Sequence, residues 1–153
     1  MNLEKEKYII LELIPSHSSS KCGKIVQLQA LKLDGLKLID RFDYRLKEEL
    51  IENKDLQEMI SYDKDMFKYI DDNIFPKFKQ FIEDLPLLII DNFYTRDYLS
   101  NLPNKMESVF NYLNLEIDDN IFNTLITKYK LQPSNHFVDL LYEAIILESN
   151  KKK

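Results

Sequence analysis

The first third of the chain alternates strand-like runs with short polar turns, and this pattern constrains the fold more than any other feature. A mostly apolar run over residues 8–14 ends at Pro15 and the polar cluster SHSSSK. A near-continuous apolar run of this length is typical of a strand buried on both faces. Apolar and polar residues then alternate over 25–33, and the LDG at 33–35 predicts a hairpin into a third strand at 37–44.

The spacing of apolar residues in the remainder predicts helices around one further strand. The fully apolar run LPLLIID, residues 85–91, has the length of a buried strand. Residues 47–72 are charged and predict one short helix and an irregular crossing segment. The longer predicted helices cover 74–82, 95–102, 105–114, a stretch from a cap at Asp118 or Asp119 to 129, and 135–147.

Composition favours a single domain without a membrane span. A chain of 153 residues with 44% hydrophobic content fits one globular domain, expected at 1–150, followed by a basic tail at 151–153. No window approaches about eighteen continuous apolar residues, and the start MNLEKEKYII does not resemble a secretory signal. The expected location is therefore cytoplasmic. The lone Cys22 excludes an internal disulfide framework and a cysteine-based metal site.

The charge balance bears on nucleic-acid binding. The formal net charge is −5, from 26 acidic and 21 basic residues. Strong non-specific binding to a phosphate backbone depends on the release of many counterions, so an acidic chain does not favour it. A local basic patch could still engage the end of one strand.

Two segments resemble a known family. The stretch GKIVQLQALKLDGLKLIDRF is similar to the second and third strands, and FPKFKQFIEDLPLLIIDN to a later helix and strand, of the proofreading-type 3′–5′ exonucleases of the DEDD superfamily, the group of the DNA polymerase III epsilon subunit and RNase T. The resemblance implies an α/β, ribonuclease H-like fold: a mixed sheet of about five strands, the first three antiparallel, flanked by helices.

The catalytic positions that the resemblance implies have largely changed. The family holds its metals with an aspartate-any-glutamate pair on the first strand, where this chain has Glu12 and Ile14. The family's histidine–asparagine pair becomes Asp91–Asn92. Glu12 is either a remnant of the metal site or a residue that reaches solvent near the strand end, and in an apolar strand its carboxylate needs a partner.

A second metal-binding aspartate follows in the family at the start of the next helix. Strict spacing places Arg96 there, and a one-residue insertion places Asp97 there. We favour Asp97, because Tyr98 and Leu99 then fall on the family's apolar helix positions. An ordinary acidic residue is also favoured in the first turn of a helix, so Asp97 has two interpretations.

The last third admits two alignments. In the first, which we prefer, NIFNTLITKYKLQP carries Asn123 in place of an aspartate, SNHFVDLLYEAI matches the penultimate helix, and the last catalytic helix is missing. In the second, DLLYEA is the last helix, Asp139 is the final metal ligand and Ser134 replaces the catalytic histidine. Asp139 is otherwise a solvated helix position. Both alignments lack the family's general base.

These changes predict an impaired enzyme. Two-metal hydrolysis places two Mg²⁺ or Mn²⁺ ions about 3.5–4 Å apart. Ile14 removes one ligand, and Glu12 reaches about 1 Å further than an aspartate in a site held to roughly 0.5 Å. Without a histidine, a general-base contribution of about 10²–10⁴ is also missing. We therefore expect a degenerate exonuclease-like domain that binds nucleic acid or protein.

Two alternatives remain open. The first is a weak 3′–5′ exonuclease on single-stranded DNA or RNA ends, dependent on Mg²⁺ or Mn²⁺, in which Glu12, Asp97 and Asp139, with Asp91, converge on metal. The second is a pure protein–protein interaction module, or a homodimer, that uses exposed apolar faces of the C-terminal helices.

Overall fold

The computed structural model of this chain describes residues 2–16, 20, 25–45, 74–115, 121–133 and 137–151. The elements expected within 47–72, the helix cap at Asp118 or Asp119, and Ser134 lie outside the described residues.

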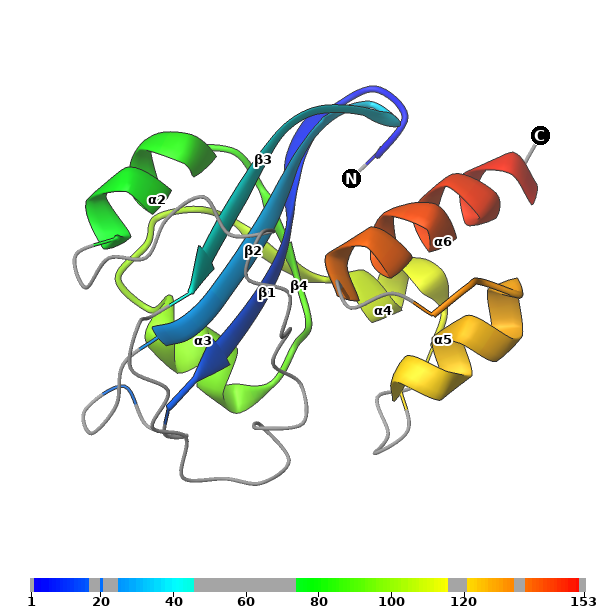
Figure 1. The fold of residues 1–153 in the computed structure, drawn as a ribbon. Coiled ribbons are helices and arrows are strands. Elements are labelled where there is room, and N and C mark those ends of the chain that lie inside the picture. Colours follow the sequence, from blue (N-terminus) through cyan, green and yellow to red (C-terminus); the bar gives the residue numbers. More distant parts are fainter. Residues whose placement is uncertain are drawn as a thin grey trace.

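A five-stranded mixed sheet forms the centre of the fold, in the order β3-β2-β1-β4-β5 (Figure 1). The first three strands are antiparallel neighbours, while β4 pairs with β1 and β5 pairs with β4 in parallel. This arrangement confirms the predicted α/β class. The strands are β1 (Lys7–Pro15), β2 (Ile25–Asp34), β3 (Lys37–Arg45), β4 (Leu87–Ile89) and β5 (Met106–Ser108).

The predicted hairpin connects β2 and β3. Asp34 pairs with Lys37, and Gly35 in the turn has a φ of +62°. A Cβ at Gly35 would also lie 2.6 Å from the carbonyl oxygen of Glu4. Glycine therefore suits this turn both for its backbone conformation and for the close approach of the N-terminal segment.

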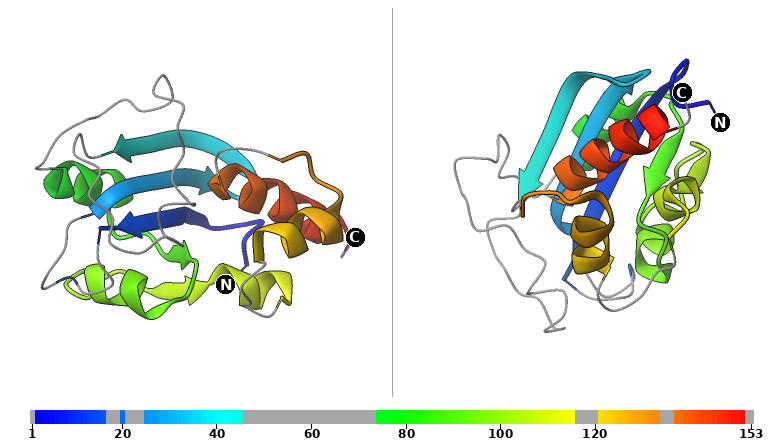
Figure 2. Two further views of the ribbon diagram at one scale, coloured as in Figure 1. Left: turned by 60° about the horizontal axis from the view of Figure 1, so that its bottom comes forward. Right: turned by 90° about the vertical axis from the view of Figure 1, so that its right-hand side faces the viewer.

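Helices cover both faces of the sheet, and each face has its own apolar core (Figures 1 and 2). Alternate side chains of β1 serve the two cores: Tyr8 and Ile10 face one, and Ile9 and Leu11 face the other. The first core includes residues of α4, α5 and α6, and the second includes residues of α2. The helices are α2 (Phe75–Ile82), α3 (Phe93–Tyr98), α4 (Val109–Leu113), α5 (Ile121–Tyr129) and α6 (Phe137–Lys151).

The prediction of one helix over 105–114 is wrong in its first half. Residues Met106–Ser108 form β5, the fifth strand, and only Val109–Leu113 is helical. The backbone of β5 finds its hydrogen-bond partners in β4. The spacing of apolar residues within one segment does not reveal such pairing with another segment.

Three boundaries also differ from the predicted ones. The helix expected at 95–102 is α3 and starts at Phe93, because the Asn92 side chain accepts the Thr95 backbone N–H and caps it. The strand expected at 85–91 is only Leu87–Ile89. The last helix runs to Lys151, the first residue of the expected tail. Among the described residues, no helix is long and apolar enough to cross a membrane.

Candidate functional site

Polar side chains form a patch on the sheet face that α6 packs against. Strand register places them in adjacent rows: Glu12 pairs with Gln29, which pairs with Asp43, while Ile14 pairs with Gln27, which pairs with Arg45. Directly paired residues project from the same face of a sheet. We call this set the polar face; its members are Glu12, Gln27, Gln29, Arg41, Asp43 and Arg45.

The polar face is largely buried. Glu12 is 3% exposed, Asp43 2% and Arg45 7%, and the two glutamines are fully buried. Buried polar groups are costly unless they are hydrogen-bonded, and each of the glutamines, Asp43 and Arg45 has an interaction partner. The patch is therefore a packed polar layer within the fold. Along the same face of β1 and β2, the side chains beyond it are apolar and belong to the core, for example Ile10 and Leu31.

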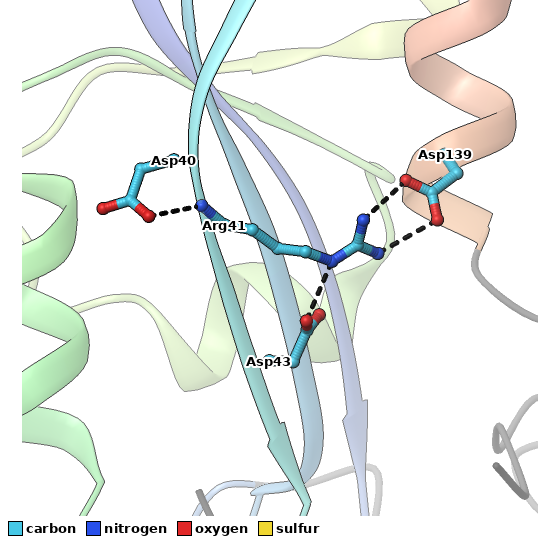
Figure 3. Close-up of polar contacts among 4 residues, drawn as sticks. All are labelled: Asp40, Arg41, Asp43 and Asp139. Atoms are coloured by element: carbon cyan, nitrogen blue, oxygen red, sulfur yellow. Dashed lines mark hydrogen bonds and ion pairs between the residues drawn. The ribbon is translucent and has the colours of Figure 1, made fainter. Parts of the chain in front are cut away.

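Arg41 connects this layer to α6 (Figure 3). Its Nη1 and Nη2 atoms donate to the two carboxylate oxygens of Asp139 at 2.9 and 3.0 Å, and its Nε donates to Asp43 Oδ2 at 2.8 Å. The Asp40 carboxylate accepts the Arg41 backbone N–H at 2.8 Å. A two-bond guanidinium–carboxylate pair is both strong and geometrically specific.

The electrostatics of Arg41 favour its charged form. Burial alone disfavours the charge, but hydrogen bonds and charge interactions with Asp139 and Asp43 outweigh it and raise the pKa of the guanidinium. One cation thus joins a carboxylate of β3 to a carboxylate of α6. Asp139 is therefore an ion-pair partner of β3 and not merely a solvated helix position.

Glu12 is a buried acid held by an amide. Its Oε1 accepts a hydrogen bond from Gln27 Nε2 at 3.4 Å, which supplies the partner that its apolar surroundings require. Burial raises the pKa of Glu12 to about 8, although the Gln27 hydrogen bond acts in the opposite direction. At neutral pH this side chain is therefore mainly protonated. The interpretation that Glu12 reaches solvent at the strand end is wrong.

Ile14 lies next to this acid, in apolar contacts. It is fully buried in a small cluster with Val26, against which the half-buried Tyr94 of α3 packs. Burial raises the pKa of Tyr94, and the charge of Glu12 adds to that effect. Ile14 is thus part of the hydrophobic packing between the sheet and α3.

Asp91 and Asn92 have local structural contacts. Asp91 accepts two hydrogen bonds from Arg96, at 2.7 and 3.0 Å, and the Arg96 hydrogen bonds hold the pKa of Asp91 below its usual value. Asn92 is the N-cap of α3. Neither side chain joins the polar face through a described hydrogen bond.

Asp97 anchors the chain between β1 and β2. Its Oδ2 accepts the backbone N–H of Ser20 at 2.7 Å. The prediction that Asp97 lies in the first turn of its helix is wrong, because α3 begins at Phe93 and ends at Tyr98.

Sequence reasoning missed the residues that dominate the site. In β3, polar and aromatic residues alternate: Arg41, Asp43 and Arg45 lie on one face, and Phe42 and Tyr44 on the other. Because side chains of a strand point alternately to its two faces, the sequence alone could have predicted this polar face. The contact between Arg41 and Asp139 had no such signal.

The described residues do not fit a two-metal centre. Within the described ranges, no group of three or more His, Cys, Asp and Glu side chains is placed to hold a metal ion. Glu12 favours its proton, Asp97 binds a backbone amide, and Asp139 binds Arg41. The expected convergence of Glu12, Asp97 and Asp139 on one metal therefore has no support from their contacts.

Comparison with known proteins supports the fold. No family model matches the chain, and no curated protein matches it in sequence. Among solved structures, it is similar to the zinc-bound E. coli exonuclease I–single-stranded DNA complex, with a TM-score of 0.58 and 12% sequence identity over 97% of this chain. The match covers 41% of the exonuclease I chain, so this chain spans less than half of that protein. The similarity shows an exonuclease-like fold.

Proposed function

We propose that this chain is a degenerate 3′–5′ exonuclease-like domain, catalytically impaired, that acts as a binding module for single-stranded nucleic acid or protein. The observation that carries the proposal is the Arg41–Asp139 pair, in which a guanidinium engages both oxygens of the carboxylate that the last described helix presents to the sheet. A carboxylate held in this way is a poor ligand for Mg²⁺ or Mn²⁺, because a cation would have to displace two charge-assisted hydrogen bonds.

The surroundings of Glu12 support the same conclusion. Metal ligation requires the carboxylate form, whereas burial holds Glu12 protonated near neutral pH. Ile14, two residues along the same strand face, offers only hydrocarbon. Both changes affect residues that would have to act together in one metal site. When catalytic groups act as a unit, removal of one of them can abolish most of the activity.

A role in nucleic-acid binding is supported by the fold. The structurally similar exonuclease I is described in complex with single-stranded DNA. Strand binding and hydrolysis use different groups, since a binding surface needs cations and stacking platforms rather than a metal cluster. The domain can therefore retain a strand-binding surface after the loss of its ligands.

The experiment is a nuclease assay on a 5′-labelled single-stranded oligonucleotide with Mg²⁺ and, separately, Mn²⁺. We expect no shortening from the 3′ end that depends on this chain's carboxylates. The assay includes Glu12→Gln and Asp139→Asn, with Asp84→Asn as the matched control, because Asp84 is exposed after the end of α2 and is not among the candidate metal ligands.

Activity that Glu12→Gln and Asp139→Asn both abolish, and that Asp84→Asn leaves intact, would contradict the proposal and establish the metal-dependent exonuclease alternative. Binding of the same oligonucleotide is measured in parallel by fluorescence anisotropy in EDTA, so that strand binding is assessed separately from cleavage.

A further inference from the structure

A basic hollow opens at the end of the molecule where α5 and α6 finish. It has a volume of about 490 Å³ and is lined by Lys128, Tyr129, Lys130, Leu147, Asn150 and Lys151. It lies outside the polar face, because Asp139 is in the first turn of α6 and Lys151 is the last residue of that helix. At 1.5 Å per residue, about 18 Å of helix separates the two positions.

The lysines are held around a tyrosine. The Nζ atoms of Lys128 and Lys151 lie 5.2 and 5.0 Å from the centre of the Tyr129 ring. Lys128 also donates to the Leu113 carbonyl at 2.8 Å, which fixes its ammonium at the rim. Lys130 follows the last residue of α5 and has a φ of +56°. The Leu131 backbone N–H donates a hydrogen bond to the Ile126 carbonyl oxygen at 3.0 Å, which caps the C-terminal end of α5.

The hollow is positive in a chain of net charge −5. Among the described residues, the carboxylate in contact with these groups is that of Glu148. Its side chain is 17% exposed, accepts a hydrogen bond from the Tyr129 hydroxyl at 2.7 Å and lies 4.0 Å from Lys151 Nζ. Three lysines therefore face one largely covered carboxylate. Leu147, 38% exposed, adds an apolar surface, and the exposed Asn150 adds a side-chain amide.

We infer that this hollow binds the phosphates of a single-stranded nucleic acid. The lining carries three lysines, whose ammonium groups bind phosphate oxygens as point charges. A nucleic-acid strand presents one such negative charge at every nucleotide, which matches several lysines gathered around one hollow. Leu147 and Asn150 offer an apolar contact and hydrogen bonds to a sugar or base beside the phosphates. The inference deepens the proposed function and names the surface that a strand would use.

The test measures the affinity of the full chain for a fluorescein-labelled oligodeoxythymidylate by anisotropy over a series of salt concentrations. The variant is Lys130→Gln with Lys151→Gln. The matched control is Lys77→Gln with Lys79→Gln, two exposed lysines of α2, whose apolar side belongs to the core on the opposite face of the sheet. Circular dichroism confirms that each variant is folded.

The plot of log K against log salt concentration has a negative slope, and each phosphate contact to a single strand contributes about 0.7 to its magnitude. Loss of two contacts should therefore make the slope shallower by about 1.4. We expect this loss, with several-fold weaker binding, in the hollow variant but not in the control. Equal slopes in the two variants, with binding by the parent chain, would overturn this inference and leave the proposed function standing.

No binding by the parent chain would overturn both the nucleic-acid role and this inference. Poly-glutamate of matched charge serves as a competitor. If it displaces the oligonucleotide as effectively as unlabelled DNA does, and loses that ability in the hollow variant, the hollow recognises acidic peptide and the inference is wrong.

Discussion

Arg41 and Asp139 lie 98 positions apart in the sequence and form a two-bond ion pair, with nitrogen–oxygen distances of 2.9 and 3.0 Å. The same guanidinium binds Asp43 on its own strand. A single cation thus links α6 to β3, and its one positive charge is shared between two carboxylates on the sheet face that α6 covers.

Removal of this cation should destabilise the fold. Arg41→Gln leaves the 3%-exposed Asp43 side chain without the guanidinium. We expect the free energy of unfolding to fall by about 1–3 kcal/mol, less than for a fully buried pair because Asp139 is partly solvated. In a double-mutant cycle with Asp139→Asn, measured by urea denaturation, the coupling should be about 0.5–3 kcal/mol.

The control for this cycle is the Arg96–Asp91 pair, whose side chains are 47% and 32% exposed. Arg96→Gln should change stability by about 0–1 kcal/mol. If Arg41→Gln costs no more than Arg96→Gln, the Arg41 pair does not hold α6 to the sheet.

Glu12 should make stability depend on pH. Burial raises its pKa from the ordinary 4.5 to about 8, so the folded chain keeps a proton that the unfolded chain releases between these values. The free energy of unfolding should therefore fall as pH rises through this window, by at most about 1.4 kcal/mol per pH unit. Thermal or urea unfolding at a series of pH values checks this trend.

Glu12→Gln is the matched variant, because its amide keeps the shape of the side chain and does not titrate. Its stability profile should be flatter between pH 5 and 8 than that of the parent chain. Parallel profiles in the two proteins would mean that Glu12 ionises in the fold without cost.

Asp97 should protect one backbone amide. Its Oδ2 accepts the Ser20 N–H at 2.7 Å. Asp97→Ala removes the acceptor at a cost of about 1 kcal/mol, and the Ser20 amide should exchange with deuterium faster, as measured by NMR. Asp97→Asn keeps an oxygen acceptor and should retain most of the protection. Unchanged exchange in Asp97→Ala would show that this contact is not maintained in solution.

The sequence predicted the sheet far better than the site. Strands β1 to β3 followed from apolar runs and one hairpin turn, because these signals are local. Strand β5 was missed, since Met106–Ser108 owes its conformation to pairing with β4 and not to its own pattern. Tertiary pairing of this kind overrides local preference in short segments.

The resemblance singled out Ile14 and Glu12 as candidate site positions, but it did not predict the contacts that these side chains make in the fold. The alternation of Arg41 and Asp43 with Phe42 marks a polar face on β3 that sequence alone could reveal. Its partner Asp139 could not be assigned, because the position of α6 over the sheet depends on packing of residues far apart in the chain. Ser134, the other predicted site position in that region, lies outside the described residues.

The most direct test of the account is titration of the parent chain with Mn²⁺, followed by electron paramagnetic resonance of the free ion. Because Arg41 already forms charge-assisted hydrogen bonds with oxygens of both Asp139 and Asp43, we predict that the free-ion signal rises in proportion to added Mn²⁺, with no saturable site that depends on these carboxylates. Saturable binding that is lost in Asp139→Asn and Glu12→Gln, and retained in the exposed control Asp84→Asn, would contradict the account and identify a working metal centre.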